Sequence, residues 1–432
     1  MNGKDKLMKH SYDTYRLYSD EKIFTSSVRI KVTMKEEVDI DVLCHAVNVA
    51  IKRYPYFAVE IVLGDDGGYD FVANNRDVVV METPSKLPLL GSEEVNRHLL
   101  YVDCQGRDIS FNISHSMCGG RGILPWVMTN VYQYVVEKYG VLPDAPGIRK
   151  PDSPLLDGED EEPSLDILTD EEPIYEYKSK KPVVMLMDYL NGMYNPFKRD
   201  PHYYFLTFEQ SDIMSFAKDN DASVASFFLA ALAKALDKVL PKKFEVIGGE
   251  IAHNPAADIG MPNTHCDLLT HVHIDYERKY FDYDMEKLGT LTRSQIILQT
   301  DPSVSCYQLR RHFSFLEEVD KVQGTKEKRT FYGKNDPSRG KEAQHGTFIV
   351  NYTGRMDWGE VADYVESYAA IVDGHLLLEV TSMADKIFVT FMQLIKKNVY
   401  VDAFCNVMDE LGIKYKLEGP YPNSRPRAKL PQ

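Results

Sequence analysis

The stretch FNISHSMCGGRG, residues 111–122, decides the fold and function predicted for this chain. An apolar, β-branched run over residues 109–113 predicts a strand. His115 follows, and Gly119, Gly120 and Gly122 then interrupt the chain ahead of a helical pattern over residues 123–139. A strand that meets a glycine-rich turn can hold a histidine rigidly at a cleft. The alternative is a structural histidine beside an ordinary turn, so the rest of the sequence is needed to choose.

Composition predicts a globular protein of two domains. The chain has 432 residues, which exceeds the size of one typical core. Its net charge is −15, from 50 basic and 65 acidic residues, and such a surface repels nucleic-acid phosphates and anionic lipid. We therefore expect neither a nucleic-acid nor a membrane partner.

Cysteine usage and hydropathy predict a cytoplasmic location. The six cysteines are scattered and form no CxxC pair, which is typical of a reducing compartment rather than of a disulfide framework. The first residues lack the apolar core of a signal peptide, and no apolar run has the length of a membrane span.

An acidic segment divides the chain. Residues 151–172 hold ten Asp or Glu and no Lys or Arg, which is typical of a solvated linker or crossover. We predict an N-terminal domain over 1–150, a linker over 151–182, a C-terminal domain over 183–420 and a frayed tail over 421–432.

Hydrophobic periodicity predicts mixed strands and helices on both sides of the linker, hence two α/β layers of similar size. The predicted strands cover residues 26–34, 58–63, 69–73, 78–81, 109–113, 203–208, 244–251, 268–274, 346–352, 375–381 and 386–392. The predicted helices cover residues 39–53, 123–139, 212–218, 222–239, 285–321 and 400–411, and residues 326–341 are predicted to form a loop.

Four stretches together resemble one family. Residues 115–122 (HSMCGGRG) are similar to the HxxxDG signature of the chloramphenicol acetyltransferase and condensation-domain superfamily, with Gly119 in the place of the aspartate. Residues 53–57 (RYPYF), 223–236 (SVASFFLAALAKAL) and 348–354 (FIVNYTG) resemble its opening segment, its post-crossover helix and the second-domain strand that faces the histidine. The likeness is closest to the standalone alcohol-acetyltransferase-like members.

The resemblance implies two similar α/β sandwich domains with a channel between them. It also implies acyl transfer from a coenzyme A thioester to an alcohol or amine, with small molecules as donor and acceptor and His115 as general base. A neutral imidazole within hydrogen-bond reach of a hydroxyl can accept its proton during attack, typically a contribution of about 10²–10⁴-fold. A pKa near 6.5 leaves most of the imidazole neutral at neutral pH.

Gly119 keeps a second function open. In the family the aspartate pairs with an arginine and holds the loop, so its loss leaves either an enzyme with an altered loop or a non-catalytic homologue that binds a small molecule or protein in the cleft. We expect the arginine to be absent or exposed, because a buried arginine without its partner is costly. A third alternative is a carrier-protein-dependent condensation-like former of amides or esters. The oligomeric state is left open.

Three further groups of residues are candidates for the site. An oxyanion requires hydrogen-bond donors, and Asn351, Tyr352, Thr353 or the Gly120 amide could supply them. By resemblance, Asn263 lies near the acceptor channel. Also by resemblance, Asp357, Trp358 and Gly359 form a structural loop, although a turn before a helix near residue 360 fits equally well.

Metal and nucleotide sites are not predicted. His271 and His273 share one strand face, but nothing in the spacing brings three or four ligands together, so we expect no metal. The basic segment 326–341 could contact the phosphates of coenzyme A or could be a solvated loop. The chain has no P-loop motif and no GxSxG nucleophile motif.

Overall fold

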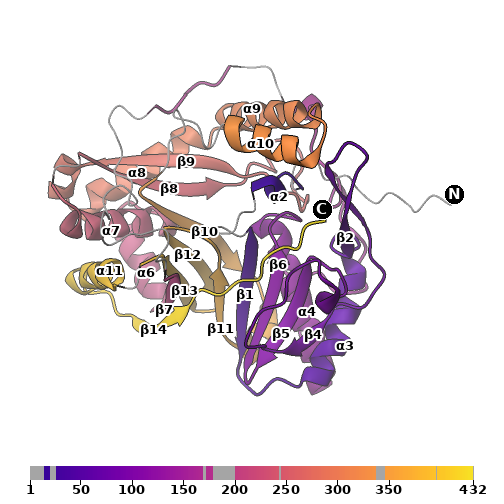
Figure 1. Ribbon diagram of the computed structural model, residues 1–432. Helices are drawn as coiled ribbons and strands as arrows, with labels where there is room; N and C mark the ends of the chain where they lie inside the picture. The colour runs from indigo at the N-terminus through magenta and orange to yellow at the C-terminus, as the bar shows by residue number, and fades with distance from the viewer. Residues whose placement is uncertain are drawn as a thin grey trace.

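The computed structural model describes residues 14–19, 26–168, 172–178, 200–242, 245–336, 346–395 and 397–431. Two large β-sheets, each with helices packed on it, form the body of the molecule (Figure 1). In the described ranges, no helix combines the length and the apolar character needed to cross a membrane.

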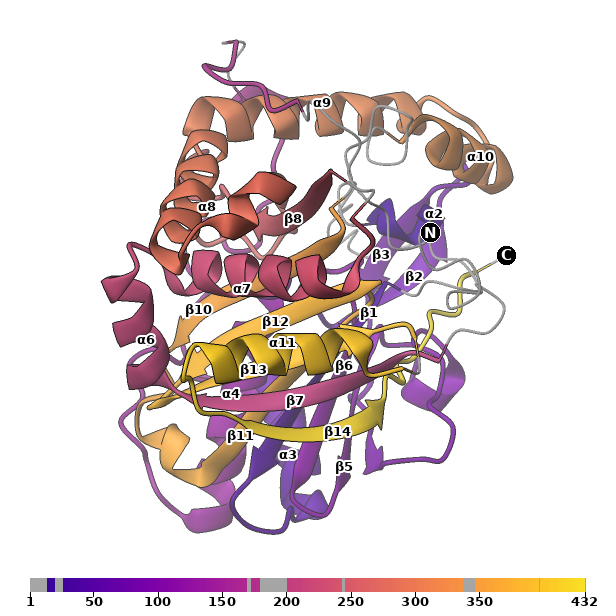
Figure 2. The same ribbon diagram turned by 90° about the vertical axis from the view of Figure 1, so that its left-hand side faces the viewer.

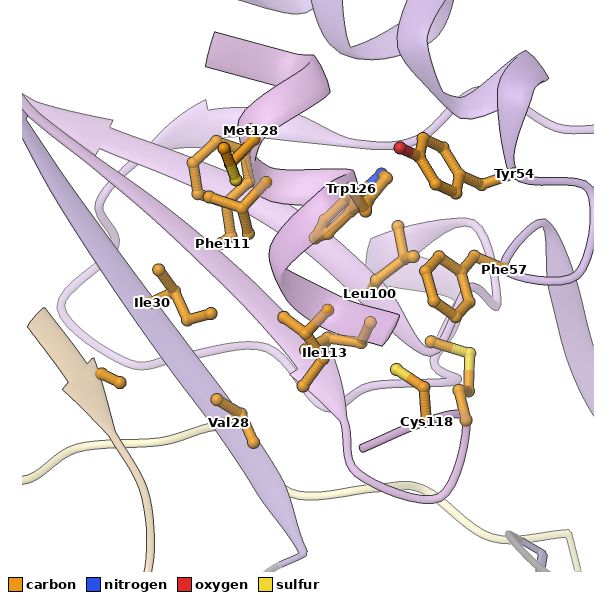
Figure 3. Packing of buried hydrophobic residues seen from close by; sticks show 14 of the residues in the cluster. Val28, Ile30, Tyr54, Phe57, Leu100, Phe111, Ile113, Cys118, Trp126 and Met128 are labelled. Carbon is orange, nitrogen blue, oxygen red and sulfur yellow. The ribbon is translucent and has the colours of Figure 1, made fainter. Parts of the chain in front are cut away.

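The first sheet has five strands in the order β11-β1-β6-β5-β4. The β1 strand alternates between fully and partly buried residues, as its sequence predicts. On the sheet lies α4, whose Trp126 meets Phe111 of β6 edge-on with ring centroids 5.5 Å apart (Figure 3). Beside α4 lies α3, whose N-terminus is capped by the Asp39 carboxylate. The bounds are β1 Ser27–Met34, α3 Ile40–Ala50, β4 Val80–Glu82, β5 Leu100–Gln105, β6 Asp108–Ser114, α4 Gly120–Tyr139 and β11 Val365–Ile371.

The second sheet has seven strands in the order β14-β7-β13-β12-β10-β8-β9. Helices α7 and α11 lie next to each other across one of its faces (Figure 2). A capping box between Ser223 and Ser226 starts α7, and most of this helix is buried, as its apolar sequence predicts. The bounds are β7 His202–Glu209, α6 Gln210–Asp219, α7 Val224–Val239, β8 Val246–His253, β9 Thr270–Glu277, α8 Met285–Gln299, β10 Phe348–Met356, β12 Leu376–Met383, β13 Lys386–Gln393, α11 Val399–Glu410 and β14 Lys416–Pro422.

A smaller group of elements joins the two sheets at one end of the molecule (Figure 1). Strands β2 and β3 of this group pair antiparallel as a hairpin, and Asp66 lies in the hairpin turn between them. The amide of Gly324, which directly precedes α10, donates to Asp66 O at 2.9 Å. The Lys328 ammonium of α10 is fully buried and lies 3.1 Å from the Asp66 carboxylate. The bounds are α2 Arg16–Ser19, β2 Val59–Leu63, β3 Tyr69–Ala73, α9 Pro302–Asp320 and α10 Thr325–Asn335.

Two segments of the second half belong to the first half in space. β11 pairs antiparallel with β1, and Ala369 of β11 lies opposite Lys31 of β1. The predicted frayed tail is wrong over its described residues, because Arg425 donates to Ser27 O at 2.9 Å and residues 427 and 429 hydrogen bond with Leu90. The domain boundaries stay a prediction.

Other differences from the predicted elements have local causes. Residues 325–335 form helix α10 where a loop was predicted, because buried Lys328 and Tyr332 lie on one side of an otherwise charged helix; residues 337–345 lie outside the described part. The helix predicted near residue 360 is a short 3-10 helix, Gly359–Tyr364, that leads into β11. Strands β5, β11 and β14 were not predicted.

Candidate active site

His115 directly follows β6, at the point where the chain turns toward α4. Its backbone amide donates to Ser26 O at 2.6 Å, which extends the β1–β6 pairing by one residue. The imidazole is 21 % exposed and its Nδ1 atom is buried. The exposed part of the side chain is therefore the edge formed by its other atoms.

A carboxylate from the second half of the chain faces the buried side of this ring. Asp267, in the loop before β9, has a fully buried side chain, and its Oδ2 lies 3.5 Å from His115 Nδ1. The same oxygen accepts a hydrogen bond from Arg16 of α2, whose side chain is 34 % exposed. Asp267 and Arg16 were not predicted as site residues, because they are far from the motif in sequence.

Two of the motif glycines allow this loop to approach. A Cβ atom on Gly119 would lie 2.6 Å from Asp267 Oδ1, and one on Gly122 would lie 2.6 Å from His265 O. Both distances are shorter than side-chain carbon atoms tolerate. A Cβ on Gly120 would meet no atom within 4 Å, so this third glycine is not required by packing.

The RYPYF segment and the acidic linker hold the Asp267 loop in place. The rings of Tyr56 and His265 stack with centroids 4.1 Å apart, and His265 Nδ1 lies 2.8 Å from Glu159 O. Glu159 is fully buried and accepts two hydrogen bonds from Arg53, at 2.8 and 2.9 Å. Arg149 reaches the same carboxylate at 3.0 Å. The predicted solvated linker is therefore wrong at Glu159, which is a structural anchor.

The surroundings of His115 keep its imidazole neutral. Burial lowers the pKa of His115, the positive charge of Arg16 lowers it further, and the Asp267 carboxylate acts in the opposite direction. Because the result lies below the ordinary value of about 6.5, the ring is largely deprotonated at neutral pH.

A second histidine–carboxylate pair, which was also not predicted, joins the neighbouring strands β8 and β9. His271 Nδ1 of β9 is 2.6 Å from Glu250 Oε1 of β8. Burial alone would raise the Glu250 pKa, but the hydrogen bond and charge of His271 help lower it to about 2. Burial likewise would lower the pKa of His271, and Glu250 raises it. The charges of Arg16 and Asp267 also act on the His271 pKa, so both histidines share these neighbours.

The predicted oxyanion candidates of β10 are engaged with β12. Asn351 Nδ2 donates to Glu379 at 2.7 Å, and burial raises the pKa of Glu379 to about 7 against this hydrogen bond. The Thr353 hydroxyl lies 2.8 Å from that of Thr381. Tyr352 packs against the core of the second sheet. The Gly120 amide lies in the first turn of α4, which follows His115 in the sequence. The oxyanion roles stay predictions.

The other predicted residues lie in loops. Asn263 Nδ2 donates to Asp157 O of the linker at 3.0 Å, and its place near an acceptor channel stays a prediction, as does the channel. Trp358 is buried in the hydrophobic core of the first sheet, which also contains Trp126 and is called the first core below. Gly359 has a φ of +51°. A Cβ on Gly147 would lie 2.4 Å from Asp357 O, so residues 357–359 pack tightly on the segment after α4. The structural role that the resemblance implies for this loop stays a prediction.

His271 and His273, the two histidines considered for metal binding, and the nearby His253 each lie against a partner within the fold. His253 Nε2 lies 3.7 Å from Asp258 Oδ2, and the ring of His273 stacks on Tyr177. Across the described ranges, no group of three or more His, Cys, Asp or Glu side chains has the geometry of a metal site.

The fold matches solved structures over nearly the whole chain, whereas no known family model and no curated protein matches the sequence. TRI101 of F. graminearum, complexed with coenzyme A and deoxynivalenol, is 10% identical with a TM-score of 0.59, over 92% of this chain and 98% of that one. The trichothecene 15-O-acetyltransferase TRI3 from Fusarium sporotrichioides is 12% identical with a TM-score of 0.54, over 92% and 93%. The first condensation domain of the CDA synthetase is 10% identical with a TM-score of 0.56, over 93% and 94%. The chain thus shares the fold of these acetyltransferases and of this condensation domain over nearly its whole length, and the predicted two-domain α/β fold class is confirmed.

Proposed function

We propose that this protein transfers an acyl group from a coenzyme A thioester to a hydroxyl or amine of a small molecule, with His115 as general base. The observation that carries the proposal is the state of His115. Its imidazole is neutral, its Nδ1 faces the buried Asp267 carboxylate, and another edge of the side chain remains accessible.

The solved structures of the same fold support the choice of donor and reaction. TRI101 was crystallised with coenzyme A, and TRI3 is named as an O-acetyltransferase. At identities of 10% and 12% these likenesses describe the fold, so the reaction of this chain rests on its own residues. The condensation domain of the CDA synthetase leaves the carrier-protein alternative as an outcome of the test.

The chemistry requires one proton acceptor at the exposed edge of His115. The acceptor hydroxyl gives its proton to Nε2 while its oxygen forms a bond with the thioester carbonyl carbon. The tetrahedral intermediate then expels the thiolate by breaking the C–S bond, and the imidazolium returns the proton to sulfur. Asp267, on the Nδ1 side, favours the tautomer that leaves Nε2 unprotonated for the first step.

The basic segment that could contact coenzyme A is partly used inside the fold. Lys328 is fully buried against Asp66, and Arg329 donates to Leu17 O at 3.3 Å. These two cations are therefore unsuited to a phosphate ligand. Lys326 and Lys334 of α10 remain as candidates for that contact.

The test is donor-dependent release of free thiol from a panel of acyl-coenzyme A thioesters with alcohol and amine acceptors. His115→Ala is compared with His45→Ala, which removes a largely exposed histidine of α3. We expect kcat/KM to fall by about 10²–10⁴-fold in the first variant and to stay unchanged in the second. For the wild type, kcat/KM should rise with pH up to the His115 pKa, below about 6.5, and then level off.

Three outcomes would overturn the proposal. Thiol release that is equal in wild type and His115→Ala would remove His115 from the chemistry. Coenzyme A binding without thiol release for any acceptor would instead indicate the non-catalytic homologue. Activity only with an acyl group carried on a phosphopantetheine protein would favour the condensation-like alternative.

A further inference from the structure

We propose that Asp267 replaces the aspartate that is missing at Gly119. Asp267, which comes from the second half of the chain, is then the positioning residue that orients the imidazole of His115. The kinetic part of this inference rests on the proposed function. Its structural part concerns only the contact between Asp267, Arg16 and His115.

The first argument is space. A Cβ atom on Gly119 would lie 2.6 Å from Asp267 Oδ1 and 3.1 Å from its Cγ. The Asp267 carboxylate thus occupies the volume into which a side chain at 119 would grow. An aspartate at 119 and one at 267 would clash and repel each other, so the fold has room for one carboxylate here.

The second argument is charge. Asp267 is fully buried and pairs with Arg16, so the arginine near the motif is neither absent nor without an acidic partner. A buried carboxylate is retained only when it is paired, and Arg16 supplies that pairing. The same two charges act in opposite directions on the His115 pKa. His271 of β9 and His312 of α9 also respond to both charges, so the pair lies at the centre of a polar cluster.

The third argument is orientation. Asp267 Oδ2 lies 3.5 Å from His115 Nδ1, on the buried side of the ring. A carboxylate on that side favours a proton on Nδ1 and leaves Nε2 as the acceptor. The Tyr56–His265 stack and the hydrogen bonds between His265 and Glu159 O fix the loop from behind. Asp267 is therefore held at a set position relative to the imidazole.

The decisive experiment moves the carboxylate back into the motif. The variants are Asp267→Gly, the isosteric Asp267→Asn, Gly119→Asp, and the double variant Gly119→Asp/Asp267→Gly. We expect each single variant to lower kcat by about 10- to 100-fold with little change in the donor KM, since partners that orient a functional histidine typically contribute that much. The double variant should recover at least tenfold over either single variant, which is a coupling between the two sites.

An NMR titration of the His115 ring gives a readout that needs no activity. Asp267→Asn should lower the His115 pKa because it removes a negative charge, and Arg16→Gln should raise it because it removes a positive one. The combined variant Arg16→Gln/Asp267→Asn should return the His115 pKa toward the wild-type value. Far-UV circular dichroism checks that each variant is folded.

The outcomes separate this inference from the proposed function. The expected pKa changes without any thiol release would leave the inference standing and reject the acyltransferase. An unchanged His115 pKa in Asp267→Asn, or a double variant no better than the product of the two single variants, would overturn the inference. Unfolded single variants with a folded double variant would support it, and a double variant that also fails to fold would count against it.

Discussion

Among single residues, the buried carboxylate of Glu159 explains why the acidic linker is ordered against the first half. It accepts hydrogen bonds from Arg53, from the Tyr56 hydroxyl at 2.5 Å and from the Leu156 amide at 2.8 Å. Burial alone would raise the pKa of Glu159, but these hydrogen bonds and the charge of Arg149 lower it. The carboxylate thus stays ionised inside the protein and connects the RYPYF segment to the loop that carries Asp267.

Glu159→Gln should lower the free energy of unfolding by about 3–5 kcal/mol, because it leaves the buried Arg53 guanidinium without its charge partner. Urea unfolding at neutral pH measures the change, with the exposed Glu161→Gln as a control expected within about 0.5 kcal/mol of wild type. A carboxylate with a lowered pKa stabilises the fold above its unfolded pKa, about 4.3, and loses this effect as the pH falls through its folded pKa. The difference from wild type should therefore shrink in acid. A change below about 1 kcal/mol at neutral pH would contradict the anchoring role.

At the scale of elements, β6, the motif turn and α4 form one unit that presents His115 to the second half. Gly119 caps α4, and its carbonyl accepts from the amides of Gly122 and Ile123 at 3.0 and 3.1 Å. Gly119 and Gly122 are where this unit touches the loop of His265 and Asp267. Between them, Gly120 faces open space.

Gly122→Ala should therefore destabilise the protein by about 1–3 kcal/mol, because its methyl group would overlap His265 O and force the loop outward. Gly120→Ala in the same helical turn should be neutral or stabilising by up to about 1 kcal/mol, since alanine lowers the entropy cost of forming the helix. Thermal and urea unfolding of both variants checks the contrast. Equal effects of the two substitutions would show that the loop does not press on α4.

For the whole molecule, segments of the second half of the chain form part of the first half. β11 completes the first sheet, and the aromatic ring of Trp358 is buried in the first core with that of Trp126. Arg425 of the tail pairs with Asp373 at 3.3 Å and donates to Ser27 O. In Figure 1 the yellow tail runs past β1 toward the hairpin end of the molecule. Unfolding of either half therefore disrupts the other.

We expect one cooperative unfolding transition for the full chain. Tryptophan fluorescence, which reports on the first core, should give the same midpoint as far-UV circular dichroism, which reports on both halves. Arg425→Ala should lower both midpoints together, because its side chain is 7% exposed and holds the tail against both halves. Two separated transitions, or a shift in only one signal, would contradict this coupling.

The sequence by itself predicted most of the elements and indicated His115 as the candidate base. Apolar alternation marked most strands, the buried helix α7 was evident from its small and apolar residues, and the order of four motifs indicated the fold and His115. These signals are local, so they are readable along the chain. Helix α10 was missed because its buried positions, Lys328 and Tyr332, include a charge whose acidic partner, Asp66, lies in the distant turn between β2 and β3.

Only the tertiary structure decided what surrounds His115. Asp267 and Arg16 meet at the ring from positions 251 residues apart, and neither lies in a recognisable motif. In the sequence, Gly119 stands where the motif has an aspartate. In the fold, the Asp267 carboxylate occupies the space that a side chain at position 119 would need. Burial and pairing of a charge depend on which distant segments come together, and that is set by the packing of the two halves rather than by local pattern.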